Sequence, residues 1–118
     1  MALSRRTLIG LTLAGTVALA GCSSTAGLPQ GTVVIDVRTP AEYAGGHLEG
    51  ATNIDVQATT FASKIVKLDK NTPYFVYCHS GNRAGQAITA MKAVGLTNLT
   101  NGGGITDAAQ TSGLKIVT

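Results

Sequence analysis

The chain has 118 residues, with nine Lys/Arg against six Asp/Glu and a formal net charge of +3. Two of the basic residues, Arg5 and Arg6, lie in the first 21 positions, so the rest of the chain has seven against six and a charge of +1. That part carries no basic stripe and no array of stacking aromatic residues, which excludes a typical nucleic-acid-binding protein. Its length is enough for one domain with a modest core.

The first 21 residues are predicted to be a bacterial lipoprotein-type signal peptide. Arg5 and Arg6 form a positive n-region, and residues 7–20 are an apolar stretch. This stretch is too short to cross a bilayer, which needs ~20 apolar residues, but it suits a signal-peptide h-region. It runs into Leu19-Ala20-Gly21-Cys22, which resembles the lipobox, whose cysteine receives a lipid. An ordinary cleaved signal is the alternative, and the paired arginines leave Sec and twin-arginine export both open.

Cys22 and Cys78 are the two cysteines of the chain. A lipid on the sulfur of Cys22 excludes a disulfide between them, and Cys78 is then an unpaired thiol in an oxidising compartment. Residues 22–30 are therefore predicted to be the lipidated cysteine and a polar, Pro-containing tether, and residues 31–118 the folded domain. The expected location is the extracytoplasmic side of a bacterial membrane, in the periplasm or at the cell surface.

The folded part begins with a predicted strand and a short helix. Residues 32–37 are a near-continuous β-branched run, typical of a strand that is buried on both faces of a parallel sheet. Thr39, Pro40 and Glu42 then predict a helix start, with Thr39 and Glu42 in a capping box and Pro40 at the first helical position. Gly45-Gly46 predicts that this helix is short.

Strands and helices continue to alternate along the chain. The predicted strands cover residues 51–56, 74–77 and 96–100, and the predicted helices 61–68 and 84–94. Gly95 suits the position that ends the second helix, with Leu96 making the hydrophobic contact that follows. Residues 102–104 are three glycines and predict a loop. The alternation predicts a three-layer α/β domain built from βαβ units.

Cys78 is a candidate nucleophile because of the residues on either side of it. It ends the apolar run 74–77, and Ser80, Gly81 and Asn82 follow, which make a poor core segment but a good anion-binding turn. Several loop N–H groups and the N-terminus of the next helix are expected to favour the thiolate and make the sulfur reactive. Arg83 adds a positive charge. The alternative interpretation of a lone cysteine is a small buried hydrophobe.

Three motifs, taken together, resemble the rhodanese family. Residues 36–54 (DVRTPAEYAGGHLEGATNI) resemble its N-terminal signature, residues 78–83 (CHSGNR) its active-site loop, and residues 101–103 (NGG) the glycine pair near its end. Residues 84–87 and 101–107 are similar to small periplasmic rhodaneses of the phage-shock-protein-E type. The resemblance implies a three-layer αβα domain with a central, mainly parallel sheet of about five strands. The chain has no tryptophan after the glycine pair, where the family often has one, so the C-terminal helix is expected to pack less tightly.

The resemblance implies a thiosulfate sulfurtransferase that works in two covalent steps. Cys78 would take a sulfane sulfur from thiosulfate or a related donor, hold it as a persulfide and pass it to cyanide or a thiol, without a metal or an organic cofactor. Arg83 would close and charge the loop and contact the donor. His79, Ser80, Gly81 and Asn82 would form the substrate-binding loop, although His79 is equally well interpreted as a solvated loop residue.

Asp36, Arg38 and Glu42 recur as a charged set in the family, and we expect them to be structural. Arg38 is predicted to pair with both carboxylates and to tie down the first helix. His47 is predicted to be a hydrogen-bonding scaffold residue. Two histidines and one free cysteine at these separations do not resemble a zinc site.

Two other functions remain as alternatives. A cysteine phosphatase of related layout has five residues between cysteine and arginine, whereas four separate Cys78 from Arg83 here, which favours sulfur over a phosphoryl group. The domain could instead be a membrane-anchored persulfide carrier with a protein as sulfur acceptor, or a redox-sensing thiol module, in either case without small-molecule turnover. The same reactive cysteine would serve these roles as well as that of the enzyme.

Overall fold

The computed structural model describes residues 27–118, so the predicted signal peptide and Cys22 lie outside the described residues. A central parallel sheet has the strand order β3-β1-β4-β5. Its strands are β1 (Val33–Asp36), β3 (Thr52–Asn53), β4 (Tyr74–Cys78) and β5 (Leu99–Gly104). Within residues 27–118, no helix is both long and apolar enough to cross a membrane.

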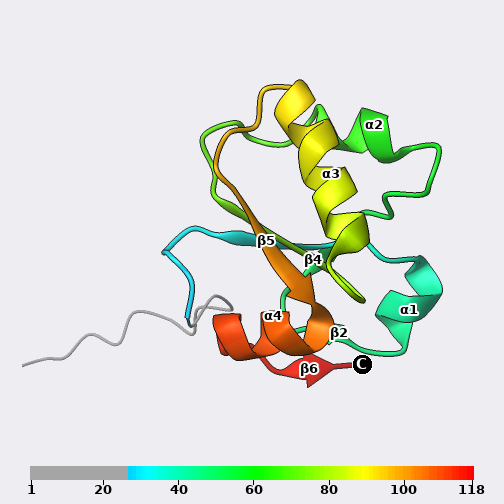
Figure 1. The fold of residues 1–118 in the computed structure, drawn as a ribbon, viewed down its shortest axis with the longest axis vertical. Helices are drawn as coiled ribbons and strands as arrows, with labels where there is room; N and C mark the ends of the chain where they lie inside the picture. Colours follow the sequence, from blue (N-terminus) through cyan, green and yellow to red (C-terminus); the bar gives the residue numbers. More distant parts are fainter. Residues whose placement is uncertain (1–26) are drawn as a thin grey trace, which may run out of the picture.

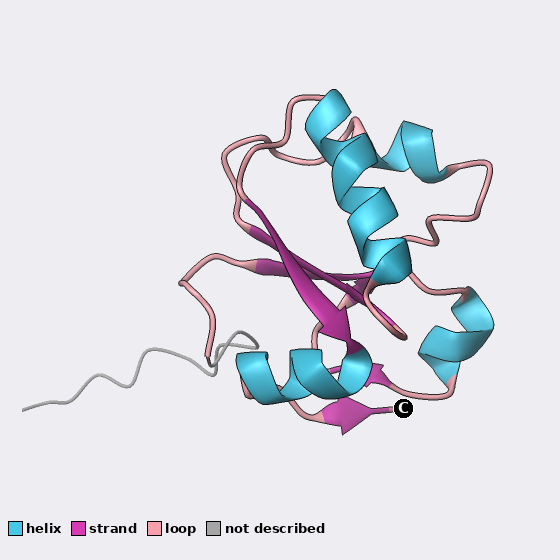
Figure 2. Ribbon diagram, in the orientation of Figure 1, coloured by secondary structure: helices cyan, strands magenta, loops and turns pink. Residues whose placement is uncertain are grey.

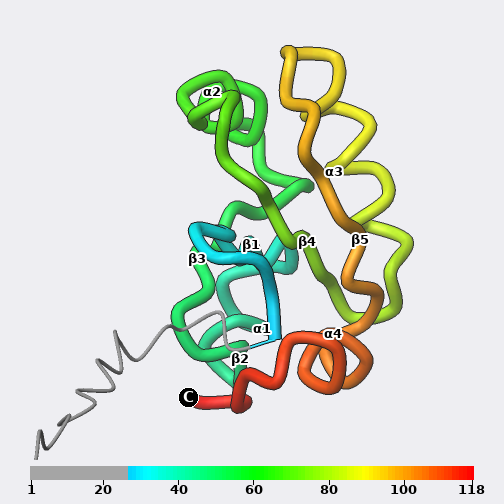
Figure 3. Tube along the Cα trace, turned by 90° about the vertical axis from the view of Figure 1, so that its left-hand side faces the viewer, coloured from blue at the N-terminus to red at the C-terminus, as the bar shows by residue number. Residues whose placement is uncertain are grey.

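Helices cover both faces of this sheet (Figures 1 and 2). One face carries α2 (Phe61–Ile65) and α3 (Asn82–Ala93). The other face carries α1 (Pro40–Ala44), α4 (Ile105–Ser112) and an antiparallel pair of short strands, β2 (His47–Leu48) and β6 (Ile116–Val117). Figure 3 shows the same arrangement turned by 90°, with α2 and α3 in the upper part of the view and α4 and β2 in the lower part. The predicted three-layer α/β class is confirmed.

Strand β4 lies at the centre of the domain and divides its core into two hydrophobic clusters. All five of its residues are buried, as expected for a strand between two helical layers. Val76 and Cys78 face the cluster under α2 and α3, whereas Phe75 and Tyr77 face the cluster under α1 and α4. The alternation follows from the two-residue period of a strand, and it places Cys78 at the end of the α3 side.

The helix ends follow the local sequence signals. Thr39 and Glu42 form the predicted capping box at the start of α1, with Pro40 in its first turn, and Gly45 ends that helix. At the end of α3, the N–H of Gly95 donates to the Lys92 carbonyl and the N–H of Leu96 to the Met91 carbonyl. This is the hydrogen-bond pair of a Schellman motif, and Leu96 is buried behind it as predicted.

Several elements differ from their predicted extent. The central sheet has four strands where about five were expected, because β2 and β6 pair with each other in a separate small sheet. Strand β3 covers two residues of the predicted 51–56, and α2 ends before Leu68. The C-terminal helix, expected to pack loosely, buries the small side chains of Ala108 and Ser112 completely.

The prediction of a loop at residues 102–104 is wrong, because these glycines complete strand β5. A Cβ on Gly102 would lie 2.6 Å from the ring of Phe75 on β4, and a Cβ on Gly104 would overlap the backbone carbonyl of His79. Gly102 and Gly104 are therefore needed for close packing inside the sheet layer. Gly103 has a φ of +78°, a conformation that favours glycine.

Residues 27–30, part of the predicted tether, contact the domain. The N–H of Gly27 donates to the Ser112 carbonyl at 2.6 Å, and Leu28 packs against the core cluster under α4. The hydroxyl of Thr32 donates to the Pro29 carbonyl at 2.6 Å. The chain is thus attached to α4 before β1 begins.

Candidate active site

The parallel strands bring the chemistry-bearing residues to one edge of the sheet. Asp36 is the last residue of β1, Cys78 the last of β4 and Gly104 the last of β5. The register pairs Asp36 with Tyr77, and Cys78 with Gly104. The carboxyl edge of a parallel sheet is where α/β proteins bind their ligands.

Cys78 lies where β4 turns into α3, and its side chain is buried. The backbone N–H of Gly81 donates to its Sγ at 2.8 Å. Gly81 is the N-cap of α3 and has a φ of +94°, a conformation that side chains other than glycine rarely adopt. We expected several N–H groups around the sulfur. Within residues 27–118, the Gly81 N–H is the one that donates a hydrogen bond to Sγ.

Most of the loop residues that follow Cys78 are exposed to solvent. His79 and Ser80 are exposed, and so is Asn82, which is the first residue of α3. Gly81 and Arg83 are partly buried. The loop therefore presents polar groups to solvent directly next to a buried sulfur.

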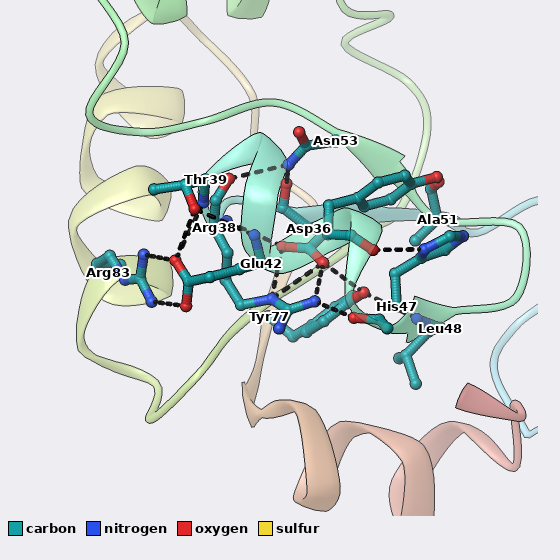
Figure 4. A network of polar contacts seen from close by, with 12 residues as sticks. Asp36, Arg38, Thr39, Glu42, His47, Leu48, Ala51, Asn53, Tyr77 and Arg83 are labelled. Carbon is teal, nitrogen blue, oxygen red and sulfur yellow. Dashed lines mark hydrogen bonds and ion pairs between the residues drawn. The ribbon is translucent and has the colours of Figure 1, made fainter. Parts of the chain in front are cut away.

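Arg83 is held by a bidentate ion pair with Glu42 of α1 (Figure 4). Its Nη1 donates to Oε1 at 2.7 Å and its Nη2 to Oε2 at 2.8 Å. Oε1 also accepts hydrogen bonds from the N–H and the hydroxyl of Thr39. The bond from Arg83, with those from Thr39, lowers the pKa of Glu42 to about 2, and the same pair raises the pKa of Arg83.

The prediction that Arg38 pairs with Glu42 is wrong, and its predicted pair with Asp36 is confirmed. Arg38 precedes the N-cap Thr39, so it lies outside α1 and does not share a helical face with Glu42. Its Nε and Nη2 instead form a buried fork with the Asp36 carboxylate, at 2.7 Å for the shortest contact. Burial alone lowers the pKa of Arg38, but the Asp36 carboxylate more than offsets this and raises it.

Asp36 is the centre of a buried polar network that joins β1 to β4 and β2. Oδ2 accepts from the Tyr77 hydroxyl at 2.8 Å, and that hydroxyl accepts from the Leu48 N–H at 2.9 Å. Burial is the main cause that raises the pKa of Tyr77, so it stays a phenol. Asn53 donates to the Asp36 and Arg38 carbonyls. No buried side-chain N or O atom in residues 27–118 lacks a hydrogen-bond partner.

His47 makes the kind of hydrogen bond that was predicted for a scaffold residue. Its Nδ1 lies 2.9 Å from the Tyr43 carbonyl, and its ring stacks on that of Tyr43 with centroids 3.7 Å apart. The Tyr43 hydroxyl in turn donates to the Ala51 carbonyl. In the described part of the chain, no three His, Cys, Asp or Glu side chains gather in a way that could hold a metal ion.

Two residues of this edge were not assigned a role from the sequence. Tyr77 was interpreted only as part of a strand, yet it links Asp36 to Leu48 across the domain. Asn101 was noted only for the glycines that follow it, yet its side chain contacts the backbone of the Cys78 loop. A polar residue at the carboxyl end of a predicted strand was the available signal for both.

Residues 25–108 match the model of the rhodanese-like domain. The chain belongs to this family. Among curated proteins, it is similar to the thiosulfate sulfurtransferase PspE of Escherichia coli, with 37% identity over 75 residues, 64% of this chain and 72% of PspE. It is also similar to the thiosulfate sulfurtransferase GlpE of Pseudomonas entomophila, with 36% identity over 59% of this chain and 62% of GlpE. The chain thus spans less than two thirds of GlpE.

Solved structures of rhodanese-like proteins match the fold over most of the described residues. A rhodanese with anions from E. coli superposes with a TM-score of 0.61 and 34% identity, over 74% of this chain and 98% of that one. A rhodanese-related protein from Thermoplasma volcanium gives 0.61 at 28% identity, over 74% and 84%. The rhodanese-like domain of the Anabaena Alr3790 protein gives 0.65 at 21% identity, over 77% and 91%, and supports the fold alone.

Proposed function

We propose that this rhodanese-like domain is a thiosulfate sulfurtransferase whose nucleophile is Cys78. The observation that carries the proposal is the position of Cys78 Sγ at the carboxyl end of β4, where it accepts the Gly81 N–H at 2.8 Å. An N–H aimed at sulfur stabilises a thiolate, and thiolates are the reactive form of cysteine. The similarity to proteins named thiosulfate sulfurtransferase supports the substrate class.

The proposed reaction has two displacements. In the first, the Cys78 thiolate attacks the outer sulfur of thiosulfate, an S–S bond to Cys78 forms, and the bond to the sulfonate sulfur breaks with release of sulfite. In the second, cyanide or a thiolate attacks the outer sulfur of the persulfide, and the Cys78 thiolate leaves. With cyanide the product is thiocyanate. The reaction consumes no net proton or electron, so it fits a site built from backbone and side chains alone.

The loop residues have proposed supporting roles. Gly81 would hold the sulfur anion through its N–H, and His79, Ser80 and Asn82 are exposed at the position from which a donor would approach. Arg83 would fix the first turn of α3 against α1 rather than act as a free charge, because Glu42 engages both ends of its guanidinium. A direct contact of Arg83 with the donor would require this pair to open.

The test is sulfur transfer from thiosulfate to cyanide, followed as thiocyanate, by the full-length chain carrying Cys22→Ser, in which Cys78 is the one cysteine. The matched variant adds Cys78→Ser. We expect turnover that the second variant abolishes. If the protein does not turn over but mass spectrometry finds one added sulfur at Cys78, the persulfide carrier replaces the enzyme. The absence of both turnover and adduct would overturn sulfur transfer from thiosulfate.

We also propose that the protein is exported and attached to a membrane through a lipid on Cys22. The support is the sequence pattern of residues 5–22, with paired arginines, an apolar stretch and Leu19-Ala20-Gly21 before the cysteine. Metabolic labelling with a radioactive fatty acid tests it, with Cys22→Ser as the matched control. We expect a labelled, membrane-associated wild type and an unlabelled variant. A wild type without label contradicts the anchor but leaves the enzyme proposal intact.

A further inference from the structure

The backbone of the Cys78 loop lies directly on the end of strand β5. A Cβ placed on Gly81 would come within 3.3 Å of the Gly103 Cα, and one placed on Gly104 would overlap the His79 carbonyl. The pairing between β4 and β5 also shifts register between Val76 and Tyr77, just before this contact. The position of the loop is therefore set by β5 as well as by β4 and α3.

Asn101 joins the two backbones with its side-chain amide. Its Oδ1 accepts from the Gly103 N–H at 2.8 Å, which closes a local Asx turn within β5. Its Nδ2 donates to the Gly81 carbonyl at 3.3 Å and so crosses from β5 to the loop. The Gly81 carbonyl also accepts from the Gly85 N–H at 3.0 Å inside α3, so Asn101 supplies a second donor that approaches from a different element.

We infer that Asn101 is a positioning residue for the reactive sulfur, acting through Gly81. The contacts run from Asn101 Nδ2 to the Gly81 carbonyl, and from the Gly81 N–H to Cys78 Sγ. Glycine has the largest backbone freedom of any residue type. At Gly81, with a φ of +94°, no side chain restricts the backbone conformation. A donor from β5 reduces this freedom and keeps the N–H aimed at the sulfur. The inference rests on the proposed function in taking Cys78 as the reactive group.

The inference can be tested because Asn101 is neutral, so its replacement leaves the charged groups near the loop as they are. Arg83 interacts electrostatically with Cys78, Glu42 and Asp55, and Asp107 of α4 lies beside Gly103. The side chain of His79 is exposed in the loop itself. Replacement of the neutral, exposed Asn101 changes none of these charges, so a change in sulfur reactivity would report on the position of Gly81.

The experiment measures the rate at which iodoacetamide alkylates Cys78 as a function of pH, in the full-length chain carrying Cys22→Ser. In this reaction the thiolate displaces iodide, so the rate needs no sulfur donor. Asn101→Ala removes both side-chain bonds. Asn101→Ser keeps a hydroxyl that can close the local turn but is too short to reach Gly81. Asn98→Ala, an exposed asparagine that precedes the same strand, is the matched control.

We expect Asn101→Ala and Asn101→Ser to be alkylated about fivefold more slowly than the parent at neutral pH, with the midpoint of the pH profile moved upward, since one hydrogen bond contributes about that factor. Asn98→Ala should match the parent. Alkylation of Asn101→Ala within twofold of the parent would overturn the inference. Full reactivity in Asn101→Ser would also overturn it, because the local turn alone would then suffice. If the parent fails to turn over thiosulfate, the proposed enzyme fails, but the alkylation rates still test Asn101.

Discussion

Two arginine–carboxylate pairs lie at the same edge of the sheet but in different surroundings. The Arg38–Asp36 pair is buried, with side-chain exposures of 6% and 0%, and the Arg83–Glu42 pair is partly open, with 22% and 34%. The buried pair connects β1 to β4 and β2 through Tyr77, whereas the open pair connects α1 to the first turn after the Cys78 loop. Burial, more than bond length, distinguishes them, since the shortest contact is 2.7 Å in both.

The comparison shows how the same kind of ion pair can contribute to stability at one place and to activity at another. Two charges without water around them depend on each other, so the loss of either leaves an uncompensated buried ion. Two charges at a partly open surface are screened, and their pairing contributes little to the free energy of folding. We therefore expect the buried pair to determine stability and the open pair to adjust the charge beside the sulfur.

The largest expected effect is that of Asp36→Asn. This change keeps the shape of the side chain but leaves the Arg38 cation buried without a counter-charge, which should lower the free energy of unfolding by about 3–5 kcal/mol. Urea denaturation followed by circular dichroism measures it, and the thiosulfate KM of the folded fraction should not change. A loss below about 1 kcal/mol would show that water reaches Arg38 and would remove the contrast between the two pairs.

Tyr77→Phe should have the next largest effect. It removes the hydroxyl that donates to Asp36 and accepts from the buried Leu48 N–H, while the aromatic ring and its packing stay. An unpaired buried N–H costs about 1–3 kcal/mol, so the urea midpoint should fall accordingly. Tyr43→Phe is the matched control, because it loses one hydroxyl bond to the Ala51 carbonyl at a partly buried site. Equal losses in the two variants would contradict the special role of the buried network.

Glu42→Gln should change the charge near the sulfur with a small change in stability. Glutamine keeps the capping box of α1, so only the ion pair with Arg83 is lost, at a cost of about 1 kcal/mol or less. The unbalanced Arg83 cation should then attract the thiosulfate dianion and lower its KM by about twofold to threefold at low salt. Initial rates at low and high ionic strength measure this effect. An unchanged KM at both would mean that Arg83 does not influence the donor.

The smallest expected effect is the acid dependence of the Glu42 contribution. The pKa of Glu42 is about 2 in the fold and 4.5 without its partners, so the unfolded chain binds more protons between these values. The stability from this pair is therefore complete above pH 4.5 and is lost as the pH falls toward 2. The difference in unfolding free energy between wild type and Glu42→Gln should shrink over this range. A difference that stays constant down to pH 2.5 would contradict the assigned pair.

The sequence predicted the features that depend on near neighbours. The capping box of Thr39 and Glu42 and the glycine stop at Gly95 both involve residues within five positions of one another, and both are present. The order of the main strands and the position of Cys78 at the end of β4 followed from hydrophobic runs and turn residues. Two-residue strands such as β2 and β6 carry too few residues to show a period.

The features that the sequence did not predict depend on distant residues. Glu42 and Arg83 are separated by 41 positions. They meet because α1 and α3 both begin after the carboxyl ends of the adjacent parallel strands β1 and β4. Gly102 and Gly104 of β5 are required by Phe75 and by the His79 carbonyl, which belong to a neighbouring strand and loop. Local spacing pointed to an Arg38–Glu42 pair and to a glycine loop, and the tertiary contacts overruled both.

The attachment of Gly27 to α4 would limit the distance between the domain and a lipid carried by Cys22. A Cβ at Gly27 would lie 2.7 Å from the Ser112 carbonyl oxygen, so the glycine fits tightly against the last turn of α4. Gly27 follows Cys22 by five positions, and five residues span at most about 18 Å. With a lipid on Cys22, the end of α4 would therefore stay within that distance of the bilayer. α4 begins directly after Gly104, which pairs with Cys78, and ends at this attachment. The length of the helix, about 12 Å for eight residues, would therefore separate the anchored end of α4 from the Cys78 edge of the sheet.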